Sequence, residues 1–185
     1  MRVGVMADSH DRIPAVEELL RRMSAAGVGL VLHAGDYCSP FALNPFRDLN
    51  MALAGVFGNN DGDREGIKAI AAVGVGGELY DSPHSVELEG KRLLIVHEMS
   101  EAAVHSVEHH RVVVHGYTHR REVRTRGDAL IINPGEACGW LFGTPSAAIL
   151  DLETMEVEFI ELTGPPWQES RRASEAAQGR TEARG

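Results

Sequence analysis

The chain has 185 residues, a formal net charge of −9, and 43% hydrophobic and 24% charged residues. This length suits one domain with a full-sized core, and the balance of residue types is that of a soluble globular protein. The acidic net charge and the 5% aromatic content argue against a large basic surface and against stacking of single-stranded bases, so nucleic acid is not an expected partner.

The N-terminal segment begins directly with an apolar strand pattern and lacks the features of a secretory signal. No apolar run approaches the ~20 residues that span a bilayer, so we expect a cytoplasmic protein with no membrane partner. The two cysteines, Cys38 and Cys138, lie far apart in the sequence without the spacing of a zinc site. We interpret them as buried free thiols.

The first part of the chain alternates strand and helix patterns. Short apolar runs rich in β-branched residues predict strands at residues 3–6, 30–33, 52–57, 93–96 and 112–115. Apolar residues at helical spacing predict helices at residues 13–26, 39–49, 64–73 and 100–109. Such alternation is typical of an α/β fold.

The second part of the chain reads as hairpins. Residues 85–88 and 92–96 flank a Glu-Gly turn, residues 122–126 and 129–133 flank a Gly-Asp turn, and residues 146–150 and 157–162 form a third pair. Strand–helix alternation followed by hairpins predicts an α/β (α+β) fold in which two packed β-sheets are flanked by helices.

The composition changes at Gly164. Two prolines follow, and residues 168–185 are dominated by Glu, Arg, Ser, Ala and Gly, with Trp167 as the last large apolar side chain. Such a segment has little to bury. We therefore predict one domain at residues 1–163 and a disordered tail at residues 164–185, with a helical docking arm as the weaker alternative.

Polar side chains follow five predicted strands where each strand ends. They are Asp8 and His10, Asp36, Asn59, His97 and His119. Each one alone is explained as a turn residue, a helix cap or an exposed histidine. Together they predict one site, because loops at the carboxyl ends of strands converge at one sheet edge. Carboxylate, amide and imidazole ligands suit Mn, Fe, Zn, Co or Ni, and a pair of such ions can activate water and clamp a phosphoryl group.

The order of these motifs resembles that of the calcineurin-like metallophosphoesterases. The motifs are Asp8-Ser9-His10, Gly35-Asp36, Gly58-Asn59-Asn60-Asp61, His97 and Gly116-Tyr117-Thr118-His119, with a later turn at Asn133-Pro134-Gly135-Glu136. Within that superfamily the chain is similar to the small bacterial and archaeal phosphodiesterases related to YfcE. The likeness extends from residue 1 to about residue 162.

The resemblance implies a four-layer αββα sandwich of two mixed β-sheets between helices. It implies two divalent ions, with manganese favoured and Fe, Ni, Co or Zn as alternatives. Asp8, His10 and His119 would hold the first ion, Asp36 would bridge, and Asn59 and His97 would hold the second. Asp36, Asn59 and His97 are thus the expected catalytic residues. A hydroxide bridging the ions would attack a small phosphate ester, with a diester favoured over a monoester. Whether the protein forms a homo-oligomer stays open.

Three positions depart from the family pattern. Tyr117 stands where a histidine normally binds the second ion, so it is either a phenolate ligand or a space-filling side chain. His115 is a weaker candidate for the missing ligand, and Glu98 replaces a family glycine that would follow His97. Asn60 stands where relatives carry a histidine that serves as proton donor. Tyr117 and Glu98 sustain one alternative function, a non-catalytic binding or scaffold module with a weakened second metal site.

Overall fold

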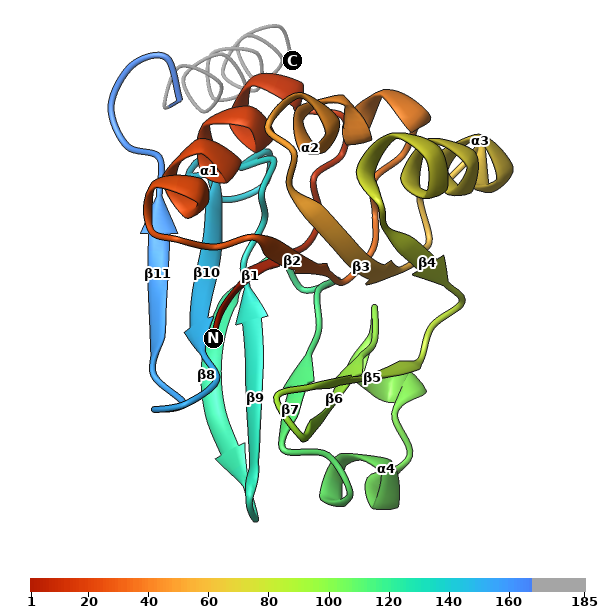
Figure 1. Cartoon of the computed structure of the whole chain (residues 1–185). Coiled ribbons are helices and arrows are strands. Elements are labelled where there is room, and N and C mark those ends of the chain that lie inside the picture. The colour runs from red at the N-terminus through yellow and green to blue at the C-terminus, as the bar shows by residue number, and fades with distance from the viewer. Residues whose placement is uncertain (168–185) are drawn as a thin grey trace, which may run out of the picture.

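The computed structural model describes residues 1–167 and forms four layers, in which two β-sheets pack face to face between helices (Figure 1). The first sheet has the order β11-β10-β1-β2-β3-β4. Its strands are β1 (Arg2–Met6), β2 (Leu30–His33), β3 (Ala52–Val56), β4 (Glu78–Tyr80), β10 (Ser146–Asp151) and β11 (Val157–Glu161). Strands β1, β2, β3 and β4 run parallel, and β10 pairs antiparallel with β1.

The second sheet has the order β5-β6-β7-β9-β8. Its strands are β5 (His84–Leu88), β6 (Lys91–Ile95), β7 (Val112–Val114), β8 (Arg121–Arg126) and β9 (Ala129–Pro134). Strands β6, β7 and β9 are parallel, whereas β5 and β8 pair antiparallel with their neighbours as hairpins. All three predicted hairpins are therefore present.

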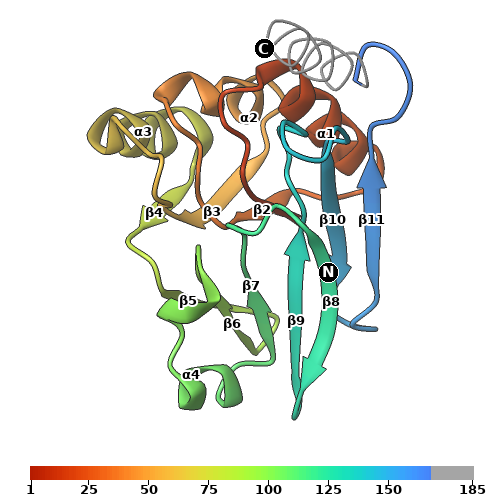
Figure 2. The same cartoon turned by 180° about the vertical axis from the view of Figure 1, so that it is seen from behind.

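Helices cover the outer face of each sheet. Helices α1 (Ile13–Ala25), α2 (Asn44–Asp48) and α3 (Arg64–Ile70) lie over the first sheet, and α4 (Val104–Glu108) lies over the second, as the two opposite views show (Figures 1 and 2). The fold is the predicted four-layer arrangement of two mixed sheets flanked by helices. No helix within residues 1–167 has both the length and the apolar composition that a membrane span requires.

Side-chain alternation along the strands builds the layers. In β7, Val112 and Val114 face the core between the sheets, while Val113 faces the core beneath α4. In β6, Leu93 lies in the inter-sheet core, and Leu94 lies on the opposite face. Each such side chain contributes about 1.5–3 kcal/mol when it is fully buried. Side chains along a strand alternate between its two faces, so a strand that is buried on both faces requires an unbroken run of apolar residues.

Three predicted helices are shorter than expected, and one strand was not predicted. The segment 39–49 divides into a 3-10 helix at Pro40–Leu43 and then α2. The α3 helix ends at Ile70 and passes into a π-helical turn at Ala71–Val75, and α4 is preceded by a separate 3-10 turn. Short helices of this kind depend on packing rather than on intrinsic propensity, so the sequence pattern overestimates their length. Strand β4 has only three residues and gives too short an apolar run to be predicted.

Trp167 packs against the domain, although the sequence placed it in the tail. Its half-buried side chain contacts the core between α1 and the first sheet. The Arg12 guanidinium donates to the Trp167 carbonyl at 3.4 Å and lies 5.7 Å from the centroid of its ring. Residues 168–185, the rest of the predicted tail, lie outside the described part of the chain.

A truncation after Thr163 should therefore be less stable than a truncation after Trp167. Losing the Trp167 contacts should lower the free energy of unfolding by about 1–2 kcal/mol and the melting temperature by about 3–6 °C. Because both truncated proteins end before residue 168, differential scanning calorimetry of the pair isolates the contribution of residues 164–167. Equal melting temperatures would show that the tryptophan contact contributes nothing.

Candidate metal centre

The predicted site residues lie where parallel strands of the two packed sheets end. Asp8 and His10 follow β1, Asp36 follows β2, Asn59 follows β3, His97 follows β6, and Tyr117 and His119 follow β7. A hydrogen bond from the Asp8 N–H to the Gly35 carbonyl at 3.1 Å joins the first two of these loops. A second bond, from the Gly116 N–H to the His97 carbonyl at 3.1 Å, joins the last two.

The backbone is strained at five of these positions. The φ angles of Asp8, His10, Asp36, Tyr117 and His119 are 53°, 38°, 63°, 65° and 59°. Residues with side chains adopt such angles at a cost of about 1–3 kcal/mol each, and the surrounding structure must hold them there. Strain repeated at one sheet edge is typical of a functional site, because it aims side chains in directions that an ordinary strand end does not allow.

Asp36 stands between two histidines. Its Oδ2 lies 3.4 Å from Nε2 of His10, and its Oδ1 lies 3.5 Å from Nε2 of His97. The backbone N–H and the side-chain amide of Asn60 donate to the two carboxylate oxygens at 2.8 and 2.7 Å. Asp36 is thereby oriented so that each oxygen faces a different imidazole, which is the placement that the predicted bridging role requires.

The three site histidines share one orientation. Nδ1 of His97 donates to the Ala34 carbonyl at 2.7 Å, and Nδ1 of His119 donates to Oε2 of Glu136 at 2.9 Å. Nδ1 of His10 lies 3.3 Å from the Cys38 sulfur. Each Nε2 is thus left facing a carboxylate. Fixing one ring nitrogen in this way is how proteins prepare the other nitrogen to bind a metal.

Three buried atoms at the site have no hydrogen-bond partner within the described residues: Oδ2 of Asp8, Nε2 of His10 and Nε2 of His97. Unpaired buried polar atoms are costly and rare in proteins. Bonds of about 2.1 Å to one ion place neighbouring ligand atoms roughly 3.0–3.5 Å apart. The contacts of Asp36 with His10 and His97 fall at 3.4 and 3.5 Å. The residues therefore fit divalent metal ions.

Asp8 is fully buried at the site. One of its oxygens lies 3.6 Å from Nε2 of His119 and accepts from the Tyr117 N–H at 3.3 Å. Burial raises the pKa of Asp8 to about 7, since desolvation outweighs the attraction of His119 and His97. Ionised Asp8 is therefore costly without a nearby cation, and metal binding here should release protons.

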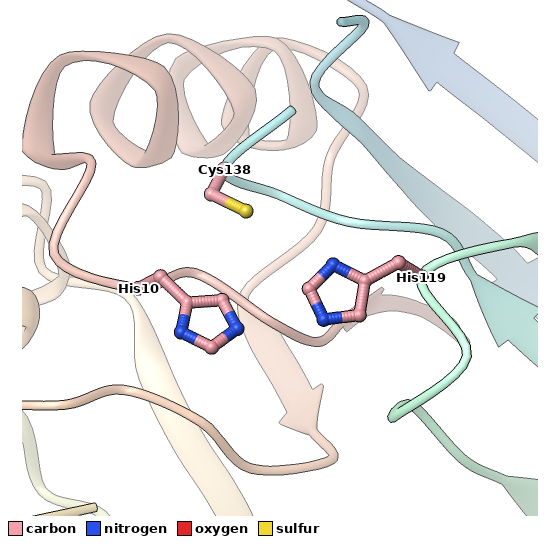
Figure 3. A group of neighbouring side chains, drawn as sticks. All are labelled: His10, His119 and Cys138. Carbon is pink, nitrogen blue, oxygen red and sulfur yellow. The ribbon is translucent and has the colours of Figure 1, made fainter. Parts of the chain in front are cut away.

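Both cysteine sulfurs lie at the site, which their sequence spacing did not indicate. The rings of His10 and His119 stack with centroids 5.2 Å apart, and the Cys138 sulfur points toward the gap between them (Figure 3). Both thiols are free, as predicted, although Cys38 is only half-buried. Burial raises the pKa of Cys38 to about 11 and that of Cys138 further still. The Cys138 sulfur can nonetheless join His10 and His119 as a metal ligand, because an ion that coordinates a thiol deprotonates it.

Asn59 is the one predicted ligand that the described contacts do not join to the others. Its side chain is exposed and makes no hydrogen bond within residues 1–167. Its neighbour Asn60 contacts Asp36 instead. The buried carboxylate of Asp61 accepts four backbone N–H groups, those of Asp36, Tyr37, Cys38 and Gly58, at 2.6 to 3.2 Å. It joins the loop after β2 to the loop after β3.

Glu136 is a site residue whose role the sequence did not reveal. Its buried carboxylate binds His119 and also accepts the backbone N–H groups of Leu141 at 3.0 Å and Phe142 at 2.6 Å. Burial opposes ionisation of Glu136, but these hydrogen bonds outweigh it and lower the pKa. The same balance holds for His119: burial lowers its pKa, but the interactions with Glu136 and Asp8 outweigh burial and raise it. The sequence feature that could have indicated this role is the carboxylate in the Asn-Pro-Gly-Glu turn at the end of β9.

Neither neighbour of the missing histidine takes its place. Nε2 of His115 lies 3.3 Å from Glu122, and its ring is buried beside Asn133, so its contacts lie at the strand end. The N–H of Glu98 bonds to Glu101 at the start of a 3-10 turn. Tyr117 is half-exposed, and its ring lies edge-on to His97 with centroids 5.7 Å apart. Tyr117 thus stands beside the predicted second-ion position.

Gly58 is required by close approach rather than by its backbone angle. A Cβ atom there would lie 2.3 Å from Oδ1 of Asp36 and 2.7 Å from Cε1 of His97. We expect Gly58→Ala to weaken divalent-metal affinity by about 10–100-fold, since both groups must move. Metal titration followed by calorimetry measures this change. The matched control is Gly62→Ala, where the nearest atom to a Cβ lies 3.7 Å away. Equal affinities for the two variants would contradict the packing described here.

A model of the calcineurin-like phosphoesterase superfamily domain matches residues 1–155. The chain therefore belongs to the calcineurin-like phosphoesterase superfamily and is a hydrolase of the phosphoesterase class, as the motif order predicts. The family implies divalent metal ions, in agreement with the clustered donor groups.

Individual relatives extend the match. Phosphodiesterase MJ0936 of Methanocaldococcus jannaschii is 35% identical over 166 residues, which are 88% of this chain and 99% of that protein. A solved archaeal phosphodiesterase superposes with a TM-score of 0.81 at 33% identity, covering 88% of this chain and all of that one. The Escherichia coli phosphoesterase YfcE matches with a TM-score of 0.62 at 18% identity, over 88% of this chain and 98% of its own, and supports the fold alone.

Proposed function

We propose that this chain is a phosphodiesterase that hydrolyses small phosphate diesters with two divalent metal ions. Asp8, His10 and His119 would hold the first ion, Asn59 and His97 the second, and Asp36 would serve both. The supporting observation is the set of buried, unpartnered ligand atoms on Asp8, His10 and His97 around the Asp36 carboxylate. The relatives named as phosphodiesterases support a diester over a monoester. Manganese is the first choice because the family resemblance favours it, and the oxygen and nitrogen donors also suit Fe, Ni, Co or Zn.

When bound, such ions would neutralise charge on the phosphoryl oxygens and lower the pKa of a bound water. The residues of the chain supply position. Asn60 fixes both oxygens of Asp36, while Ala34 and Glu136 fix the rings of His97 and His119. The Asn60 amide is not a useful proton donor at neutral pH. Esters with good leaving groups should therefore react fastest.

The direct test compares two chromogenic substrates after metal analysis of the purified protein. Chelator-treated protein reloaded with Mn²⁺ should hydrolyse bis(p-nitrophenyl) phosphate faster than p-nitrophenyl phosphate, and it should be inactive without metal. About two ions per chain are expected at saturation. If reloaded protein binds metal but hydrolyses neither ester, the non-catalytic binding module becomes the better description. Faster hydrolysis of the monoester would overturn the diester assignment.

Tyr117→His should strengthen binding of the second metal ion. It replaces an edge-on phenol ring beside His97 with an imidazole, a better ligand for these metals. We expect about 10-fold tighter binding of the second Mn²⁺ and higher activity at limiting metal. The measurement is a titration of Mn²⁺ into chelator-treated protein, with bound metal and hydrolysis followed together.

Tyr117→Phe serves as the matched control, since it keeps the ring and removes only the hydroxyl group. If Tyr117 merely fills space, the phenylalanine variant should bind metal as the wild type does. Weaker binding by Tyr117→Phe would show that the phenol is itself a ligand. Unchanged binding by Tyr117→His would show that the second ion does not lie beside this residue.

A further inference from the structure

A pocket of about 500 Å³ opens beside the proposed metal centre, and it is bordered by two arginines and two phenylalanines. The lining includes His119, Glu136, Arg120, Arg121, Phe142 and Phe159. Because His119 belongs both to the pocket and to the proposed first-ion ligands, a molecule in the pocket can extend directly to the metal centre. The pocket thus adjoins the place where the phosphorus of a substrate would lie.

Arg120 brings an uncompensated positive charge to this pocket. Arg121 pairs with Glu161, whereas Arg120 has no carboxylate partner within residues 1–167. Arg12, beside the same loop, instead bonds to the carbonyl of Cys138 and lies 4.6 Å from the Trp140 ring centroid. Of the two arginines that line the pocket, Arg120 is the one without a carboxylate partner in the described residues, so its charge is the one that an anionic ligand would neutralise.

Phe142 is exposed but held in place. Its side chain is 41% exposed, yet its backbone N–H donates to the buried carboxylate of Glu136 at 2.6 Å. At Gly139 the φ angle is 62°, and a Cβ would lie 2.6 Å from Pro145, so the start of this loop is tightly constrained. The Arg120 guanidinium lies 4.7 Å from the Phe142 ring centroid. Because the guanidinium lies over one face of this ring, a flat ligand ring would stack on the opposite face, and the constrained loop backbone limits the entropy lost on binding.

A larger pocket, of about 660 Å³, has the opposite character. It lies at the far end of β10 and β11, and its charged lining comprises Asp151, Glu156, Glu158 and Arg2, with Arg2 already bonded to Glu158 at 3.1 Å. Because three carboxylates outnumber the one arginine, which is already paired, this pocket repels an anionic phosphate ester. The smaller pocket beside His119 is therefore the one whose chemistry suits a diester.

We propose that the pocket beside His119 binds an aromatic group of the phosphodiester, stacked on Phe142, with Arg120 facing the negative charge of the phosphate. This inference rests on the proposed function and narrows it to diesters that carry a flat ring, either an aryl group or a nucleobase. The ring belongs to the alcohol that stays on phosphorus. We assign the ring in this way because the pocket is lined by His119, whereas Asn60, at the position of the family's proton donor to the leaving group, contacts Asp36 and does not line the pocket.

Three diesters with the same p-nitrophenolate leaving group test the proposal in Mn²⁺-loaded protein: methyl p-nitrophenyl phosphate, bis(p-nitrophenyl) phosphate and thymidine 5′-(p-nitrophenyl phosphate). They differ only in the group that remains. Phe142→Ala should raise KM about 3–10-fold for the two aromatic diesters, with kcat within about 2-fold, and should leave the methyl diester unchanged. Arg120→Gln should raise KM for all three. Leu141→Ala, an adjacent side chain that is 67% exposed and does not line the pocket, is the matched control and should change none.

A preference for one aromatic substrate in the wild type that disappears in Phe142→Ala identifies whether an aryl ring or a nucleobase is bound. Equal KM changes for methyl and aromatic diesters in Phe142→Ala, or none, would overturn the pocket assignment while leaving the hydrolytic function intact. If the wild type hydrolyses no diester, calorimetric measurement of thymidine 5′-monophosphate binding still tests the pocket assignment. Binding lost in Phe142→Ala and kept in Leu141→Ala supports the pocket, and equal binding by all three proteins refutes it.

Discussion

Asp36→Asn is expected to reduce phosphodiester hydrolysis by about 1,000-fold or more while the domain stays folded. The carboxylate faces His10 and His97 with one oxygen each, and the proposed function requires its full negative charge between two cations. An amide offers one oxygen instead of two, so one of the two donors from Asn60 would meet an NH₂ group. The measurements are turnover of bis(p-nitrophenyl) phosphate, bound Mn²⁺ by elemental analysis, and the melting temperature.

Asp63→Asn provides the matched control for this change. Asp63 lies on the neighbouring loop, and its side chain accepts the Gly66 N–H at 2.9 Å at the start of α3. Asparagine caps a helix about as well as aspartate, so both activity and stability should be retained. If Asp36→Asn folds, loses none of its metal and keeps near-normal turnover, the two-ion mechanism is wrong.

The sequence predicted the sheets better than the helices, and the reason is physical. Strands β6 and β7 are buried on both faces, so their runs of Leu, Ile and Val stand out against the surrounding residues. The short α2 and α4 helices have five residues each and gain their stability from packing. Packing partners come from distant parts of the chain, so local patterns cannot set the ends of such helices.

The same distinction applies to the site. The order of Asp, Asn and His at strand ends predicted which loops converge, because parallel strands bring their carboxyl ends together. It did not predict that Asn60 rather than Asn59 would contact Asp36, since side-chain direction depends on the loop backbone. Nor did it predict the bond between His119 and Glu136, which are 17 residues apart and joined by the β8–β9 hairpin. Such contacts follow only from the assembled sheet.

Asp61→Asn is expected to have the largest effect on stability. Oδ1 of Asp61 accepts from Tyr37 and Cys38 at 2.6 and 2.9 Å, and Oδ2 accepts from Asp36 and Gly58 at 3.2 and 2.7 Å. Asparagine would present its NH₂ group to one of these pairs, which leaves two buried N–H groups without an acceptor. At about 1–3 kcal/mol for each unsatisfied group, and with the charge-assisted bonds lost, we expect a loss of about 3–5 kcal/mol.

Such a loss should lower the melting temperature by about 6–20 °C in a domain of this size. It should also weaken metal binding, because the bonds to Asp61 hold the Asp36 backbone at its φ angle of 63°. Calorimetric melting and Mn²⁺ titration measure both effects. Asp81→Asn is the control: its side chain is 78% exposed and, within residues 1–167, pairs only with Arg64, so the melting temperature should hardly change. Asp61 does not bind the proposed ions directly. A variant that melts at a lower temperature and binds metal more weakly would therefore show that the loops after β2 and β3 are held together by hydrogen bonds. Together these loops would form the part of the site that binds the second ion. A variant with wild-type melting and affinity would show that the four backbone contacts are dispensable and that Asp36 is held by Asn60 alone.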